Sequence, residues 1–168
     1  MTVNFPCEKS YEVVDMKVAT TRYPKGWGHE LWIHNDEQYC GKLLSFDARK
    51  RCSFHYHIEK TETFFLRSGR IDVISCDRAS LKQYFQVDEL GSIAPTVPPV
   101  AIALHLVAYV VRNIVPPKPF NVTTLLPGDA FEVPRDLVHQ MIAREQSELF
   151  EFSTQHFEHD SYRIVKGD

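Results

Sequence analysis

Short segments rich in aromatic and β-branched residues, each bounded by turn-forming residues, recur along most of the chain. Such segments are typical of β-strands. Ser68-Gly69-Arg70 lies between two of them and predicts a hairpin turn, and Leu126-Pro127-Gly128-Asp129 predicts another turn. Regularly spaced short strands of this kind predict an all-β barrel or a double-sheet jelly roll. The predicted strands are residues 39–46, 53–58, 63–66, 71–75, 131–133, 138–143 and 148–152.

The segment of about residues 80–121 breaks this pattern, because six prolines surround the apolar run VAIALHLVAYVV, residues 100–111. The run is shorter than the ~20 residues that cross a bilayer, and it contains His105, so we expect no membrane span. Its periodicity fits either a buried helix or a pair of buried strands. We expect an insertion that covers one face of the barrel or buries its apolar side against a second subunit, which would give a homodimer.

The composition indicates one ordinary globular domain over residues 1–168, with 43% apolar and 12% aromatic residues. The net charge is −3 and no large cluster of lysine or arginine occurs, which argues against a nucleic-acid partner. The first residues lack the basic and apolar regions of a secretory signal, so we expect a cytoplasmic protein. Four cysteines without a Cys-x-x-Cys pair are expected to be reduced thiols.

Residues 53–70, SFHYHIEKTETFFLRSGR, hold the clearest candidate for chemistry. On a strand His55 and His57 share a face while Tyr56 takes the other, so the two imidazoles can bind one cation. Glu62 follows after a short connection, and His139 lies in the distant segment PGDAFEVPRDLVHQMIA. An isolated His-x-His pair is more often a polar surface pair, and the metal-site hypothesis therefore rests on the combination.

These two segments resemble the two motifs of the cupin superfamily. The first motif, His-x-His, four residues, Glu, six residues, Gly, corresponds to His55, His57, Glu62 and Gly69. In the second motif, Gly128, Pro134 and His139 match, while Asp136 replaces a second glycine. Asp tolerates left-handed turn geometry better than most residues, so the replacement is compatible with the motif.

The resemblance implies a single cupin domain with a double-stranded β-helix, a jelly-roll barrel that carries the insertion near residues 80–121. It also implies one divalent metal ion inside the barrel, bound by His55, His57, Glu62 and His139. Zinc, iron, manganese, nickel and cobalt all suit three imidazoles and one carboxylate.

Two flanking segments are similar to those of cupin-type mannose-6-phosphate isomerases and related sugar-phosphate proteins. Residues 23–44 resemble a K/R-P-W-G-x-E segment, in which Lys25, Trp27, Gly28 and Glu30 match and Gly26 replaces the proline. Residues 148–168 resemble the tail of the same group, through Glu151, Ser153, Thr154, Asp160 and Arg163. The resemblance implies a small-molecule substrate, a sugar or sugar phosphate.

An aldose–ketose isomerase requires a base and a group that stabilises an enediolate. The metal would supply the stabilisation, and Glu62 or Glu151 is the predicted base. Lys25, Glu30, Lys42 and Arg163 are the predicted substrate-binding residues, although surface lysines are more often simply solvated. Two other functions stay open: a metal-dependent dioxygenase, and a non-catalytic carbohydrate-binding cupin.

Overall fold

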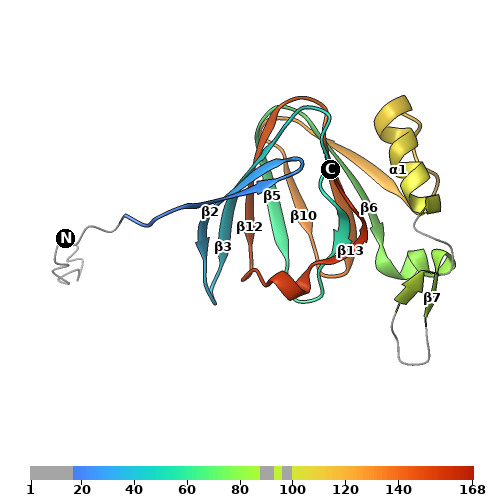
Figure 1. Cartoon of the computed structure of the whole chain (residues 1–168), viewed down its shortest axis with the longest axis horizontal. Coiled ribbons are helices and arrows are strands. Elements are labelled where there is room, and N and C mark those ends of the chain that lie inside the picture. The colour runs from blue at the N-terminus through green and yellow to red at the C-terminus, as the bar shows by residue number, and fades with distance from the viewer. Residues whose placement is uncertain (1–16, 88–92, 96–99) are drawn as a thin grey trace, which may run out of the picture.

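The computed structural model describes residues 17–87, 93–95 and 100–168, and two antiparallel sheets form its main body (Figure 1). The first sheet has the order β1 (Thr21–Lys25), β2 (Gly28–Asn35), β3 (Cys40–Phe46), β12 (Ser147–Ser153), β5 (Glu62–Ser68), β10 (Ala130–Val133). The second has the order β13 (Tyr162–Val165), β4 (Phe54–Tyr56), β11 (Leu137–Ala143), β6 (Ile71–Asp77), β9 (Asn121–Leu125). The remaining elements are β7 (Phe85–Val87), β8 (Ile93–Pro95), α1 (Val100–Arg112), and the 3-10 helices η1 (Arg78–Tyr84) and η2 (Glu158–Asp160).

All seven predicted strands are present, and the predicted jelly roll is confirmed. Alternate residues of β3 and β12 are buried, which is the period of two that a strand imposes on a sheet with one covered face. β1, β2, β9 and β13 were not predicted. Their sequences, TRYPK, GHELWIHN, NVTTL and YRIV, carry charged or turn-forming residues or are short, so the strand pattern is weak in them.

Two apolar clusters flank the second sheet. The inner cluster fills the barrel between the sheets and contains Leu44, Phe46, Phe64, Leu66, Ile71, Val73, Met141 and Leu149, among others. The outer cluster joins the far face of the second sheet to α1, whose Ile102, Leu106 and Tyr109 are buried in it. These three positions are spaced four and three residues apart and so lie on one side of a helix.

The apolar run of the insertion is therefore a helix that covers one face of the barrel, as Figure 1 shows for α1 beside β6. The described helices are too short or too polar to cross a membrane. Cys40, Cys52 and Cys76 are buried free thiols, whereas Cys7 lies outside the described residues, as does most of the segment considered for a secretory signal.

Both predicted turns have the expected backbone, with φ of +85° at Gly69 and +98° at Gly128. Asp136 has a φ of +63°, so it occupies the left-handed conformation that the second motif usually gives to glycine. The Asp136 N–H donates to the carbonyl of His57 at 2.8 Å, and its carboxylate accepts from Arg78 at 2.7 Å. The turn thus connects the two motif segments directly.

Candidate metal centre

Three histidines converge inside the barrel because neighbouring strands of the second sheet present them to one point. His139 on β11 lies opposite His55 on β4 in the antiparallel register, and His57 follows two residues after His55. One ring nitrogen from each of the three lies within 4.8 Å of the others. His57 and His139 are buried, and His55 borders the cavity described below.

The orientation of each imidazole is fixed by a hydrogen bond from its Nδ1 to a backbone carbonyl. The carbonyls are those of Ser53 for His55 (2.9 Å), Asp160 for His57 (2.6 Å) and Leu137 for His139 (3.1 Å). A carbonyl oxygen only accepts, so each Nδ1 carries the hydrogen and each neutral ring presents the lone pair of Nε2. This arrangement is the usual support for metal-binding histidines. Burial lowers the pKa of His55 and His57, which favours the neutral, ligating form.

Glu62 brings a fourth acceptor to the same point. Its Oε2 lies 3.3 Å from Nε2 of His139 and 3.6 Å from Nε2 of His57. Glu62 Oε2 and His139 Nε2 are both buried without a hydrogen-bond partner. Acceptor atoms that face one another in a buried space need a cation or a shared proton between them. Metal–ligand bonds of about 2.1 Å place adjacent ligands roughly 3 Å apart, which fits these distances. The three histidines are therefore arranged to hold a divalent metal ion, and Glu62 lies against two of them.

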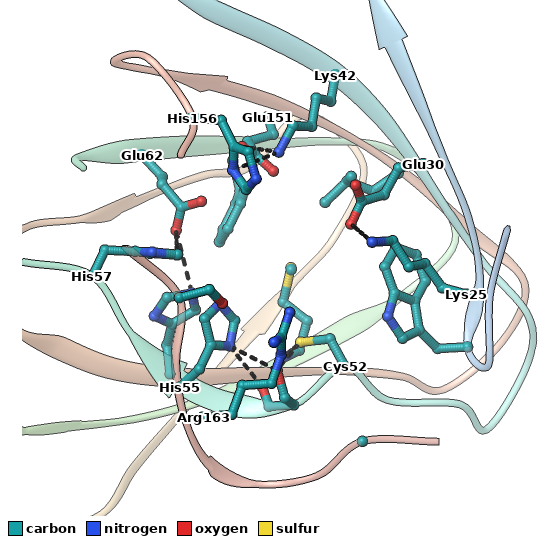
Figure 2. Close-up of a pocket in the computed structure, with 18 of the residues that line it drawn as sticks. Lys25, Glu30, Lys42, Cys52, His55, His57, Glu62, Glu151, His156 and Arg163 are labelled. Atoms are coloured by element: carbon teal, nitrogen blue, oxygen red, sulfur yellow. Dashed lines mark hydrogen bonds and ion pairs between the residues drawn. The ribbon is translucent and has the colours of Figure 1, made fainter. Parts of the chain in front are cut away.

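A buried lysine that the sequence interpretation missed holds the other oxygen of Glu62. The Nζ of Lys60 lies 2.6 Å from Glu62 Oε1 and 2.5 Å from Glu151 Oε1, and its residue is 2% exposed. Lys42 continues the series, at 3.3 Å from Glu151 Oε1 and 3.2 Å from Nδ1 of His156 (Figure 2). Charges therefore alternate in sign from the ligand group to the cavity wall.

These ion pairs set the protonation states. Burial alone would raise the pKa of Glu62, but Lys60, His139 and His57 together outweigh it and hold the pKa well below its usual range. Burial is likewise outweighed at Glu151, whose pKa is lowered by Lys60 and Lys42. Burial alone would lower the pKa of Lys60, yet Glu151 and Glu62 raise it. Both carboxylates are thus ionised and Lys60 is charged at neutral pH.

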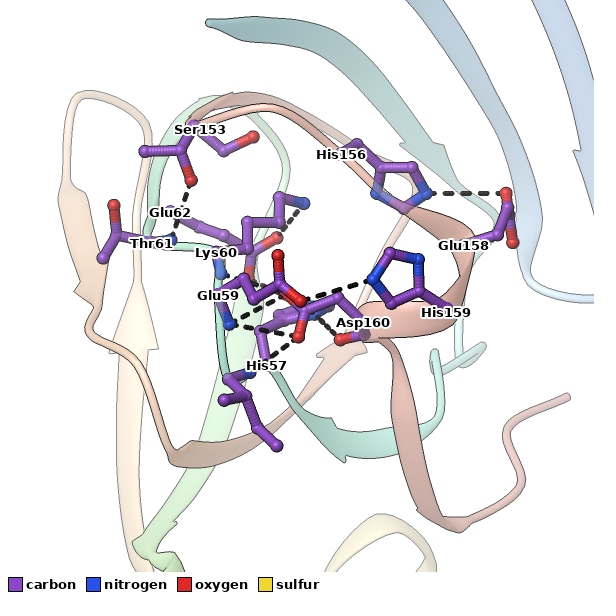
Figure 3. Close-up of polar contacts among 12 residues, drawn as sticks. His57, Glu59, Lys60, Thr61, Glu62, Ser153, His156, Glu158, His159 and Asp160 are labelled. Carbon is purple, nitrogen blue, oxygen red and sulfur yellow. Dashed lines mark hydrogen bonds and ion pairs between the residues drawn. The ribbon is translucent and has the colours of Figure 1, made fainter. Parts of the chain in front are cut away.

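Asp160 fixes the loop that carries the ligands. Its buried carboxylate accepts the N–H groups of Ile58 (2.8 Å), Glu59 (3.1 Å) and Lys60 (3.0 Å), and its carbonyl accepts from His57 (Figure 3). The sequence interpretation named Asp160 only within the tail that resembles the sugar-phosphate proteins, and it did not name His156 as a site residue. Their roles depend on contacts across about a hundred residues of sequence, as the pairing of Asp160 with residues 58–60 shows, and local spacing carries no signal for such contacts.

The ligand group forms part of the wall of a cavity of about 420 Å³. The predicted residues Lys25, Glu30, Lys42, Glu151 and Arg163 all line it, together with Lys60 and His156. Lys25 pairs with Glu30 at 3.3 Å, and Glu30 also accepts from the indole N–H of Trp32 at 2.8 Å. Trp27, Leu44, Phe64 and Met141 supply an apolar part of the wall. The structure thus brings the predicted residues around one space.

Comparison with known proteins supports the fold. No protein-family model matches the sequence, and no curated protein does. Among solved structures, the capsular polysaccharide assembling protein CapF from Staphylococcus aureus has a TM-score of 0.57 at 9% identity, over 90% of this chain and 34% of that one. A variant of oxalate decarboxylase from Bacillus subtilis has a TM-score of 0.56 at 14% identity, over 86% of this chain and 30% of that one.

KdgF from Halomonas sp. is similar along nearly its whole length, with a TM-score of 0.52 at 12% identity over 87% of this chain and 94% of that one. The present chain spans about a third of the length of the CapF and oxalate decarboxylase chains. At these identities the likeness concerns the fold, and the two motifs with their converging ligands agree with it. The chain has the fold of the cupin superfamily, with a three-histidine group arranged to hold a metal ion.

Proposed function

We propose that this protein is a metal-dependent isomerase of a sugar or sugar phosphate. The observation that carries the proposal is a second buried carboxylate, Glu151, in the wall of the same cavity as the ligand group. Glu62 faces the histidine ligands through one carboxylate oxygen and pairs with Lys60 through the other. Glu151 is therefore the better placed of the two predicted bases. A bound divalent metal would polarise the substrate oxygens and stabilise developing negative charge.

The proton transfer of an aldose–ketose isomerisation can be assigned to one atom of Glu151. Among the described residues, its polar contacts with Lys60, Lys42 and Ser153 all go to Oε1. Oε2 is therefore the oxygen that takes the proton from one carbon and returns it to the neighbouring carbon. Lys60 and Lys42 keep Glu151 ionised before the transfer, and their charges oppose the charge of the enediolate.

The remaining walls suit a carbohydrate. The apolar C–H faces of a sugar ring can pack against Trp27, Leu44 and Phe64, which line the cavity and are buried. Lys25 and Glu30 form an ion pair in the wall of the same cavity, where both groups can bond to hydroxyls. The volume of about 420 Å³ lies within the range of roughly 300–1,000 Å³ that small-ligand pockets occupy.

The test is turnover of a sugar panel by protein reconstituted with each candidate metal. We expect interconversion of an aldose and a ketose among mannose 6-phosphate, fructose 6-phosphate, mannose and lyxose, followed by NMR. In deuterated water the product should acquire deuterium at the carbon that exchanges its proton, because the proton resides on a carboxylate between the two steps.

Glu151→Gln should abolish turnover, and Glu148→Gln is the matched control. Glu148 lies on the same strand but at the surface, paired with Arg67 at 3.0 Å. Turnover that survives Glu151→Gln would refute the assignment of the base. Bound iron with oxygen consumption and no isomerisation would indicate a dioxygenase, and saturable sugar binding without turnover would indicate a binding protein.

A further inference from the structure

Three lysines of the cavity are neutralised by carboxylates of the chain itself. Lys25 pairs with Glu30 at 3.3 Å, Lys42 with Glu151 at 3.3 Å, and Lys60 with Glu62 and Glu151 at 2.6 and 2.5 Å. A negatively charged ligand group would have to compete with these partners. The side of the cavity formed by these pairs therefore suits neutral hydroxyls better than an anion.

Arg163 enters the cavity from the other side, on β13. In the pairing of β13 with β4, Arg163 lies opposite His55 and Tyr162 lies opposite Tyr56. Tyr162 stacks on Tyr56 at 5.0 Å between ring centroids, and Tyr56 belongs to the outer apolar cluster. Because side chains alternate along a strand, Arg163 points to the inner face, as His55 does. Figure 2 shows Arg163 beside His55, away from Lys42 and Glu151.

Lys25, Lys42 and Lys60 each have an acidic partner, whereas the guanidinium of Arg163 has none among the described residues. Within residues 17–87, 93–95 and 100–168 no hydrogen bond or ion pair engages it, and it lines the cavity as a solvent-exposed residue. Two acidic side chains that line the same cavity have other contacts, since Glu158 pairs with His156 at 3.4 Å and Asp168 accepts from the Arg51 N–H at 2.9 Å. Lys166 also lines the cavity and adds positive charge on this side.

We propose that the sugar bound here carries a carboxylate or a phosphate, and that Arg163 binds this anion. The planar guanidinium donates two parallel N–H groups to such an anion. Facing residues of an antiparallel pair have Cβ atoms about 4.5–5.5 Å apart, so the anion lies on the His55 side of the metal position. The sugar part of this inference rests on the proposed isomerase, whereas the anion site rests on Arg163 alone.

The experiment is calorimetric binding to the zinc-loaded protein by two series of ligands: mannose, mannuronate and mannose 6-phosphate, and glucose, glucuronate and glucose 6-phosphate. In at least one series, an anionic member should bind roughly 10- to 100-fold more tightly than its neutral parent, as hydrogen bonds to charged groups permit. Tighter binding of the uronate would identify a sugar acid, and tighter binding of the phosphate would identify a sugar phosphate.

Arg163→Gln should remove most of that preference, and Arg163→Lys should restore part of it, because lysine keeps the charge but not the paired donors. Arg112→Gln, a matched loss of charge at the exposed end of α1, should leave the preference intact. Equal binding of neutral and anionic members in both series, or a preference that survives Arg163→Gln, would overturn the proposal. Anion binding through Arg163 without isomerisation would refute the proposed function alone.

Discussion

Replacing Lys60 with Met tests whether the buried ion pairs organise the site. Met is similar in length and apolar, so the substitution removes the charge while filling most of the space. Lys60 is 2% exposed, and its ammonium contacts Glu62 and Glu151 at 2.6 and 2.5 Å. Without it, two ionised carboxylates remain buried near one another, and their pKa values rise because the main cause that lowers them is lost.

The expected cost follows from the burial of the pair. Removing one partner of a buried ion pair destabilises a protein by about 3–5 kcal/mol, since the other charge is left uncompensated. Lys42 still contacts Glu151 at 3.3 Å, so we expect the lower end, about 3 kcal/mol. This is a large part of the roughly 5–15 kcal/mol by which domains are stable.

Urea unfolding of metal-free protein at pH 7 measures this difference. Lys118→Met is the control, because Lys118 is exposed and makes a hydrogen bond to Asn121 at 3.0 Å; it should change stability by at most about 0.5 kcal/mol. Adding Glu151→Gln to Lys60→Met should recover part of the loss, since it removes one of the unpaired charges. A loss below about 1 kcal/mol for Lys60→Met would refute the reasoning.

His139→Ala should lower metal affinity by more than the roughly 10- to 100-fold typical of losing a group that supports a ligand, and elemental analysis should show a lower metal content. His159→Ala, at an exposed position, should change neither. Asp160→Ala should lower metal affinity by about 10- to 100-fold in competition with a chelator, because the loop loses the carboxylate that binds its N–H groups. The melting temperature of metal-free protein should fall as the pH drops below about 6.5, because buried His57 resists the protonation that the unfolded chain accepts. It should fall further below about 4.5, because the lowered pKa of Glu62 contributes stability only while that group is ionised. Unchanged stability down to pH 4 would contradict the assigned pKa shifts.

Part of the metal-site prediction is local, whereas His139 entered it only through the resemblance to the second cupin motif. His55 and His57 share a face through the period of a strand, and Glu62 and Gly69 follow at spacings that a short connection and a hairpin impose. The backbone of Asp136 was predicted for a similar reason, since the tolerance of Asp for positive φ is a property of the residue itself. Local rules therefore sufficed for the shared face of His55 and His57 and for the turns, but not for His139.

The segment of residues 100–111 shows where local rules stop. An apolar run of this length satisfies both a buried helix and buried strands, and periodicity does not separate them. The outcome depends on the outer face of the second sheet, which offers an apolar surface to Ile102, Leu106 and Tyr109. Tyr109 also donates a hydrogen bond from its hydroxyl to the buried Asp72 at 2.8 Å, and no sequence pattern predicts this contact.

Lys60 was missed because its acidic partners are brought to it by the pairing of strands that are distant in sequence. β12 pairs with both β3 and β5, and this places Glu151 directly opposite Lys42 and Ser153 opposite Glu62. Lys60, just before β5, is thereby enclosed between two carboxylates that are 89 residues apart in sequence, at positions 62 and 151. A lysine seen only in its local sequence is expected to be solvated.

The structure separates two roles, keeping the proposed base ionised and binding an anion. The sequence interpretation gave Lys25, Lys42 and Arg163 one role, substrate binding. Lys42 is 2% exposed and already contacts Glu151 and His156, so its charge serves mainly to hold the proposed base in its ionised form. Substrate binding by Lys42 remains a prediction, but a bond to an anionic substrate group would require Lys42 to exchange an internal partner for the ligand. Arg163 requires no such exchange, because it reaches the cavity from the opposite sheet. The charge pattern therefore favours proton transfer at the Glu151 side and recognition of an anion at the Arg163 side.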